Sequence, residues 1–180
     1  MKIEIDWKEI FSLLAYLAVI GILTFAIIRF VGQRTLVDGS SMEPALSDGD
    51  NLIVDKLTYR FREPERFDII VFPYEEEPEI CYIKRVIGLP GETVRIDEDG
   101  FIYIDGEKLK ESYGREVIKQ PGIAAEELTL GQDEYFVLGD NRNDSMDSRD
   151  SRVGLIEREE IIGRAVFRIY PLGRMGKIDH

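Results

Sequence analysis

Two adjacent serines follow a glycine in the stretch VDGSSMEPAL, and a serine can act as a nucleophile. Gly39 can adopt positive φ and Pro44 disfavours helical geometry at Glu43, so a bent turn also explains the stretch on local grounds. A serine attacks a carbonyl only when a neighbouring base takes its proton. Residues elsewhere in the chain must therefore show whether this stretch is a structural turn or contains a nucleophile.

Histidine is excluded as that base, because the single histidine, His180, is the last residue, where chains fray. Ser-His-Asp chemistry, Cys-His chemistry and a histidine-rich metal site are excluded with it. A neutral lysine is the known substitute. Lys84 lies in ICYIKRVIG, where strand alternation places it on the face of Ile80, Tyr82 and Val86, opposite Arg85. Desolvation there would lower its pKa toward that of a general base; a surface lysine with an apolar stem is the alternative.

A third polar segment, GDNRNDSMDSRDSRVG, runs from Gly139 to Gly154 directly after the apolar stretch EYFVLGD. Its residue types are turn formers, so a solvated loop is one interpretation. A calcium loop fits badly, because Arg142 falls where an oxygen ligand is required and Ser145 falls where the turn glycine should be. The interleaved Asp and Arg residues can instead cross-link the segment into a rigid shelf by charge-assisted hydrogen bonds.

The elements that must position these segments are short β-strands. Strand-like runs separated by turn signals predict a mainly β, mostly antiparallel domain with barrel or sandwich closure. Good hairpin turns lie at DEDG and IDGE, a brief helical turn is expected near Ile161, and GQRTLVDG is expected to be a linker. The predicted strands lie in DNLIVDKLTY, RFDIIVFPY, ICYIKRVIGLPGE, ETVRIDEDG, FIYIDGEKL, DEYFVLGD and GRAVFRIYPL.

The N-terminus predicts a transmembrane helix. The run from Ile10 to Ile28 has no charge, and roughly 19 residues at about 1.5 Å each match the hydrocarbon thickness of a bilayer. A cleaved signal peptide is the alternative, but the leader is not strongly basic and no small-x-small cleavage site follows. We therefore expect a short segment at 1–9, an anchor at 10–31 and a β domain at 32–180. Flanking charges leave the orientation open, since Lys2 and Lys8 precede the span and Arg29 and Arg34 follow it.

Composition sets the remaining limits. The 180 residues contain 44% hydrophobic residues, enough for one domain with a core. With 35 acidic and 23 basic residues, the net charge of −12 argues against nucleic-acid binding. The single cysteine, Cys81, cannot form an intrachain disulfide and is expected to be a small buried hydrophobe.

The three segments SSMEPAL, YIKRVIGLPGE and GDNRNDSMDSR, in this order behind an apolar span, resemble the motif blocks of bacterial type I signal peptidase. That family consists of membrane-bound Ser-Lys endopeptidases that remove signal peptides from exported proteins. The resemblance covers nearly the whole chain after the span. It implies a serine endopeptidase that requires no cofactor or metal, on the family's mainly antiparallel β domain.

The resemblance also implies residue roles. Ser41 would be the nucleophile, with its backbone N–H meeting the oxyanion, and Lys84 would be the general base. Ser145 would hydrogen-bond the lysine amine. The remaining residues would support the site or bind substrate: Asp147 and Arg149 as a bracing ion pair, Asp140 and Arg142 as stiffening residues, and Gly39, Met42, Leu46, Tyr82 and Ile83 along a cleft for small side chains of an Ala-x-Ala-like site. Some members carry a serine where this chain has Gly39, so a second oxyanion donor would have to be another group.

By the same resemblance, the N-terminus would be cytoplasmic and the catalytic domain extracytoplasmic, with signal peptides and the lipid bilayer as partners. Two alternatives use the same features differently. A non-catalytic membrane-anchored assembly protein of this fold would be expected to lose Ser41 or Lys84. A self-cleaving Ser-Lys regulator would carry a DNA-binding headpiece where this chain has its span. The sequence leaves the oligomeric state undetermined.

Overall fold

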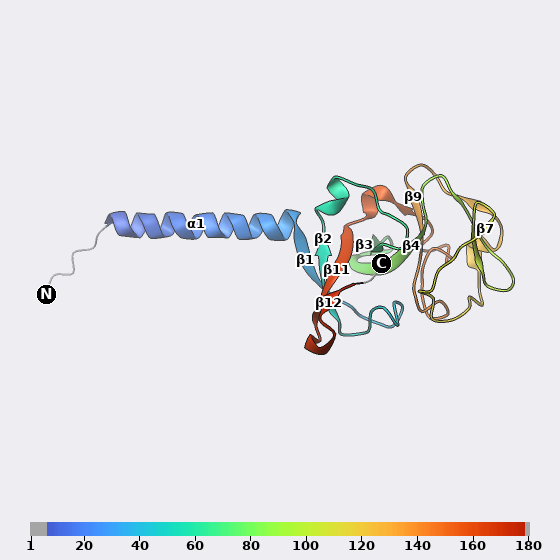
Figure 1. Cartoon of the computed structure of the whole chain (residues 1–180). Coiled ribbons are helices and arrows are strands. Elements are labelled where there is room, and N and C mark those ends of the chain that lie inside the picture. Colours follow the sequence, from blue (N-terminus) through green and yellow to red (C-terminus); the bar gives the residue numbers. More distant parts are fainter. Residues whose placement is uncertain (1–6, 179–180) are drawn as a thin grey trace.

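The computed structural model describes residues 7–178, so His180 and the first six residues of the predicted N-terminal segment lie outside the described part. One long helix, α1 (Trp7–Phe30), projects from a β domain (Figure 1). Its apolar window, Trp7–Ala26, is long enough to cross a bilayer and is not buried against the domain. The helix lies where the sequence predicts the anchor.

An eight-stranded antiparallel sheet forms the body of the domain. Its strands follow the order β1-β2-β11-β3-β4-β9-β10, and β12 also pairs with β11. The bounds are β1 Gly32–Leu36, β2 Asn51–Asp55, β3 Ile69–Tyr74, β4 Glu77–Gly88, β9 Glu134–Leu138, β10 Ile156–Glu157, β11 Gly163–Tyr170 and β12 Gly176–Lys177.

A second, four-stranded sheet lies on the side of the domain away from α1, where Figure 1 labels β7. Its order is β7-β6-β5-β8, and the two predicted hairpin turns join β5 to β6 and β6 to β7. The strands are β5 Thr93–Ile96, β6 Ile102–Ile104, β7 Glu107–Lys108 and β8 Leu128–Thr129. Short 3-10 turns complete the chain: η1 Thr58–Arg60, η2 Gly122–Ala125, η3 Arg158–Glu160 and η4 Leu172–Arg174.

The structure confirms the antiparallel β prediction but not the barrel. In the described chain the large sheet is an open path from β1 to β10, with no pairing between these two ends. The second sheet packs against part of the first, because Ile87 and Leu138 share a buried cluster with Val94 and Ile104. Separate clusters of buried side chains fill the space around each sheet.

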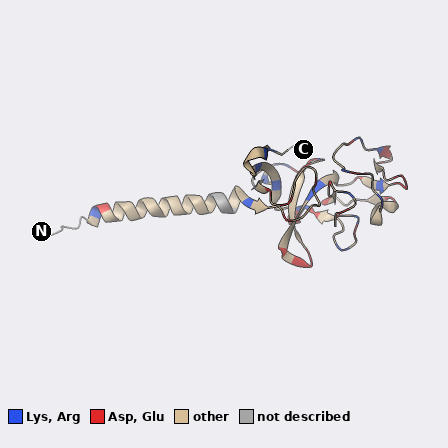
Figure 2. Cartoon of the chain, turned by 90° about the horizontal axis from the view of Figure 1, so that it is seen from below, with Lys and Arg blue, Asp and Glu red and all other residues tan. Residues whose placement is uncertain are grey.

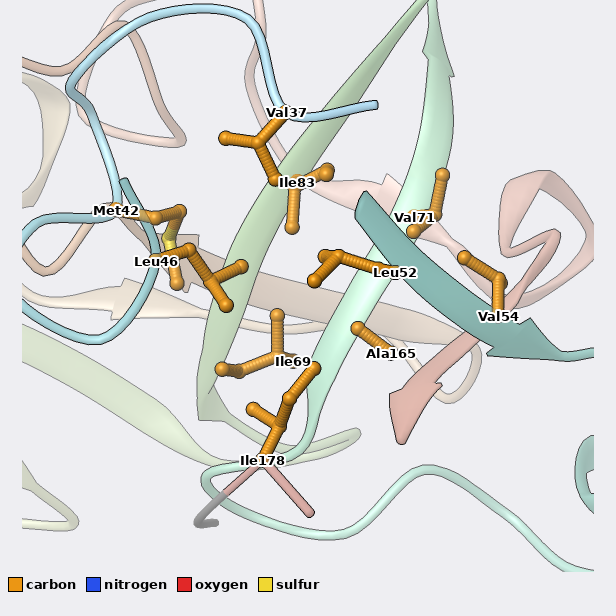
Figure 3. Close-up of a cluster of buried hydrophobic side chains, with 10 residues drawn as sticks. All are labelled: Val37, Met42, Leu46, Leu52, Val54, Ile69, Val71, Ile83, Ala165 and Ile178. Atoms are coloured by element: carbon orange, nitrogen blue, oxygen red, sulfur yellow. The ribbon is translucent and has the colours of Figure 1, made fainter. Parts of the chain in front are cut away.

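One core cluster is central to the site. Figure 3 shows it between β2, β3, β4 and the loop that joins β1 to β2. That loop contributes Val37, Met42 and Leu46, and the strands contribute residues such as Leu52 and Ile83. The loop that carries the two serines is therefore fixed by its own apolar side chains.

Two sequence expectations were wrong. The segment GQRTL is no linker, because it forms β1 and pairs with β2 along its whole length. Cys81 is exposed, because the first part of β4 extends beyond the core and only its second half is covered on both faces. Alternation identifies the faces of a strand, but it does not show where the strand leaves the core.

Candidate active site

Ser41 and Lys84 form a hydrogen-bonded pair. Ser41 lies on the β1–β2 loop and Lys84 on the buried half of β4, and Lys84 Nζ is 2.9 Å from Ser41 Oγ. The amine also donates to the carbonyl of Ile83 at 3.1 Å. A neutral amine can use its lone pair to accept the Ser41 hydroxyl proton, so the pair has the geometry of a nucleophile and its base.

Burial perturbs the pKa of Lys84. The residue is only 4% exposed, and this desolvation lowers its pKa from 10.5 to about 8, against the opposing effect of the Asp147 and Asp140 carboxylates. The amine also lies 5.0 Å from the centroid of the Tyr82 ring. Near neutral pH an appreciable fraction of Lys84 is therefore neutral, as a general base requires.

The Ser41 loop, residues 37–50, bends at Gly39, whose φ is +97°. Asp48 accepts the N–H of Gly39 at 2.9 Å, and Asn141 donates its N–H to the Ser41 carbonyl at 3.0 Å. The Ser40 hydroxyl donates to Asp144 at 2.7 Å. These contacts assign the neighbouring serines different surroundings, with only Ser41 next to Lys84.

Behind the pair lies the shelf, residues 139–149. Asp147 and Arg149 form a bidentate ion pair, with both nitrogen–oxygen distances at 2.8 Å, and Asp147 also accepts the N–H of Gly139 at 3.0 Å. Asp140 forms a second bidentate pair with Arg85, at 2.8 and 2.7 Å. Both pairs are buried, so each carboxylate is held by two charge-assisted bonds in a water-poor environment.

The family model described as signal peptidase, peptidase S26, matches residues 8–170. The chain belongs to the signal peptidase family. A probable signal peptidase I-2 of Synechocystis sp. is 39% identical over 160 residues, which is 86% of this chain and 71% of that protein. Signal peptidase I of Leptolyngbya laminosa is 41% identical over 164 residues, 87% of this chain and 78% of that protein.

A signal peptidase I of Bacillus licheniformis is 35% identical over 179 residues, 96% of this chain and 95% of that protein. The crystal structure of a signal peptidase I from Enterococcus faecalis is 35% identical, with a TM-score of 0.46, and covers 57% of this chain and 97% of that chain. As a member of the signal peptidase family the chain is a peptidase, and its N-terminal helix fits the membrane anchoring of the family.

In this signal peptidase family member the shelf is cross-linked internally by Asp147 and Arg149, as its sequence suggested, but it is also held from outside. A second loop, the strap (residues 110–123), holds it. Glu111 pairs with the buried Arg142 at 2.7 Å, and the Arg115 N–H donates to the Asp140 carbonyl at 2.8 Å. Arg149 Nη1 donates to the Gln120 carbonyl at 3.3 Å. Sequence reasoning missed the strap and Glu111, because a lone Glu among turn residues carries no signal for a distant arginine.

Arg85 was also missed as a site residue. It is fully buried, its guanidinium lies 3.8 Å from the centroid of the Tyr113 ring, and Tyr113 belongs to the strap. Alternation correctly places Arg85 on the face opposite Lys84, but that face is covered as well. The sequence signal that could have identified Arg85 was Asp140, because this acidic residue follows an apolar strand and needs a basic partner.

Ser145 lies beside the pair without bonding to Lys84. Its Oγ is buried and has no hydrogen-bond partner among the described residues, so the expected bond to the lysine amine is not formed here. The Ser41 loop and the shelf approach each other closely at Gly139, where an added Cβ would lie 2.2 Å from Ser145 Oγ and 2.5 Å from the Ser41 carbonyl oxygen. Only glycine at position 139 permits this approach.

The residues expected along a substrate cleft are mostly internal. Met42, Leu46 and Ile83 are buried in the cluster of Figure 3, whereas Tyr82 is half-buried and stacks on Tyr74 with ring centroids 4.9 Å apart. Gly39 is exposed at the bend of the Ser41 loop. Met42, Leu46 and Ile83 therefore belong to the apolar core next to Ser41 and Lys84.

Proposed function

We propose that the chain is a signal peptidase I, a serine endopeptidase that cleaves signal peptides from exported preproteins after an Ala-x-Ala-like site. Ser41 is the nucleophile and Lys84 the general base. The observation that carries this proposal is the 2.9 Å contact between Ser41 Oγ and a buried lysine of lowered pKa. Membership of the signal peptidase family supports the substrate class.

The reaction follows from these groups. Lys84 accepts the hydroxyl proton while Ser41 Oγ attacks the scissile carbonyl, and the resulting ammonium then gives that proton to the leaving amine. The signal peptide remains as an ester on Ser41 until a water, deprotonated by Lys84, hydrolyses it. The Ser41 N–H makes no hydrogen bond within the described chain and is available to the oxyanion.

The other predicted residues have supporting roles in this proposal. Asp147, Arg149, Asp140 and Arg142 fix the shelf, and Ser145 hydrogen-bonds the lysine amine during the reaction; its buried Oγ, which has no partner among the described residues, supports this role. Gly39, Met42, Leu46, Tyr82 and Ile83 shape the site for small side chains, with the substrate added as a strand. The anchor at 10–31 leaves the N-terminus in the cytoplasm and the catalytic domain, 32–180, outside.

The test is cleavage of a preprotein with an Ala-x-Ala site by the detergent-solubilised full chain. Ser41→Ala and Lys84→Ala should each reduce kcat by about 10⁴-fold or more, because nucleophile and base act as one unit. Ser40→Ala is the matched serine control, since its hydroxyl bonds Asp144. Lys110→Ala is the lysine control, since Lys110 is exposed.

Both controls should retain near-normal activity. An active Lys84→Ala variant would show that the base is misassigned. A wild-type chain that cleaves nothing would favour the non-catalytic assembly protein.

A further inference from the structure

A groove of about 540 Å³ lies where the anchor meets the domain. Its apolar lining comes from Val31, directly after α1, from Ile53 of β2, from Leu57 and Phe61 around η1, and from Val166 of β11. Phe61 is 83% exposed. An apolar groove with an exposed aromatic side chain at its edge is costly to leave in water.

The anchor fixes the depth of this groove. The apolar window of α1 ends at Ala26 and the helix ends at Phe30, so the residues 27–30 advance the chain by about 6 Å. A headgroup layer is also roughly 5–8 Å thick on each side of the hydrocarbon core. When α1 spans a bilayer, Val31 and the groove next to it would therefore lie at the level of the phospholipid headgroups; Figure 1 shows β1 and β2 at the domain end of α1.

Asp55 and Arg62 also line the groove, and Arg62 pairs with Glu65 and Asp68, whereas Lys56 and Arg60 lie next to lining residues in the chain. The backbone N–H of Lys56 donates to the Val31 carbonyl at 2.9 Å, and the Arg60 guanidinium lies 5.2 Å from the centroid of the Phe30 ring, so both residues are at the anchor end of the domain. Within residues 7–178 neither side chain pairs with a carboxylate, and the nearby Asp55 already accepts bonds from Leu57 and Thr58. By contrast, acidic residues cover the tip of the β3–β4 hairpin, one of the red segments of Figure 2.

We propose that this groove binds one anionic phospholipid. The phosphate lies against Lys56 and Arg60, and the glycerol end of an acyl chain packs against Val31, Leu57 and Phe61. Continuity with the membrane anchor decides in favour of a lipid, because the groove is immersed at headgroup depth whenever α1 spans the bilayer. The site depends on membrane anchoring and not on the proposed cleavage chemistry.

Fluorescence quenching tests the proposal on the full chain, since Trp7 is its only tryptophan. In a Trp7→Phe background, Phe61→Trp places the probe at the groove and Phe101→Trp places a reference probe beside the four-stranded sheet, away from α1. The proteins are reconstituted in phosphatidylcholine vesicles with increasing fractions of lipid brominated near the acyl carbonyl end. The brominated lipid carries either a phosphatidylglycerol or a phosphatidylcholine headgroup.

The groove probe should lose emission at low fractions of brominated phosphatidylglycerol, and the reference probe should not. Lys56→Gln and Arg60→Gln should each reduce the preference for phosphatidylglycerol over phosphatidylcholine about fivefold, the usual contribution of one cation at a membrane surface. Lys110→Gln, an exposed lysine far from α1, should leave the preference unchanged.

Equal quenching of the two probes would overturn the proposal, as would equal effects of the two headgroups. Loss of quenching when a signal peptide is added would assign the groove to the apolar segment of the substrate, and would also overturn it. Because no arm measures cleavage, failure here leaves the Ser41–Lys84 proposal unaffected.

Discussion

Lys84 lies between the apolar core below it and two carboxylates of the shelf, which act on its pKa in opposite directions. Desolvation lowers the pKa and the carboxylates raise it, with a balance at about 8. At neutral pH the resting pair thus contains both ammonium and amine. The carboxylates are neutralised by Arg85 and Arg149, which limits their pull on the proton.

This balance predicts the pH dependence of cleavage. Only neutral Lys84 accepts the Ser41 proton, so kcat/KM should rise with pH, with an acidic limb near the pKa of about 8, and then level off. The measurement is kcat/KM from pH 6 to 10 on a peptide substrate without ionising groups in that range. A limb that stays below pH 6 would assign the rate to a carboxylate.

The same balance predicts a pH-dependent stability. The pKa of Lys84 is about 8 in the fold against an ordinary 10.5, so the folded state opposes its protonation by about 3 kcal/mol. That cost is complete below pH 8, declines as the pH rises toward 10.5, and is absent above it. Lys84→Met should therefore be more stable than wild type at pH 7.

Thermal melts of the two proteins in detergent measure this difference in stability. The gain should shrink as the pH rises above 8, while Lys110→Met, at an exposed site, should show no such trend. A gain that is constant with pH would mean that burial does not neutralise Lys84.

The family resemblance predicted Ser41 and Lys84 as neighbours, as the structure shows, but alternation could not predict the burial of Arg85 or the exposure of Cys81. Alternation shows which side chains share a face, whereas burial depends on what other segments place over that face. The second sheet and the strap cover the Arg85 side of β4, whereas Cys81 is exposed. Both outcomes depend on residues distant in the sequence.

At the scale of elements, the site joins the Ser41 loop, the buried half of β4, the shelf and the strap. Motif order predicted the first three together. The strap has no motif, since its residues act through backbone groups and through single partners such as Arg142. The wrong linker prediction has a related cause, because an edge strand such as β1 needs little apolar sequence when β2 supplies its pairing.

The closeness of the Ser41 loop and the shelf predicts the effect of one methyl group. In Gly139→Ala the new Cβ would clash with Ser145 Oγ and the Ser41 carbonyl, so the shelf must move and kcat should fall at least about 100-fold. Gly173→Ala is the control, since no atom lies within 4 Å of its Cβ position. Near-normal cleavage by Gly139→Ala would show that the loop and shelf tolerate separation.

At the scale of the whole molecule, one anchor and one acidic β domain predict a single-pass topology. We expect external protease to degrade the domain in spheroplasts and to spare an N-terminal tag, because the proposed orientation exposes only the domain. An intact domain under conditions that digest a known external protein would reverse the orientation.

The antiparallel architecture could be predicted from the hairpin turns, but the open sheet could not, because closure depends on the pairing of strands distant in sequence.

The strand that follows the anchor has a consequence for substrate choice. Ser41 comes 11 residues after Phe30, and the five residues of β1 take up nearly half of that path, about 17 Å at strand spacing. Even a fully extended tether would reach only about 40 Å. The anchor and β1 therefore limit how far from the bilayer Ser41 can act. A peptide bond beyond that distance is not cleaved whatever its sequence, and a peptide bond held near the membrane surface reaches Ser41 before any side chain is recognised.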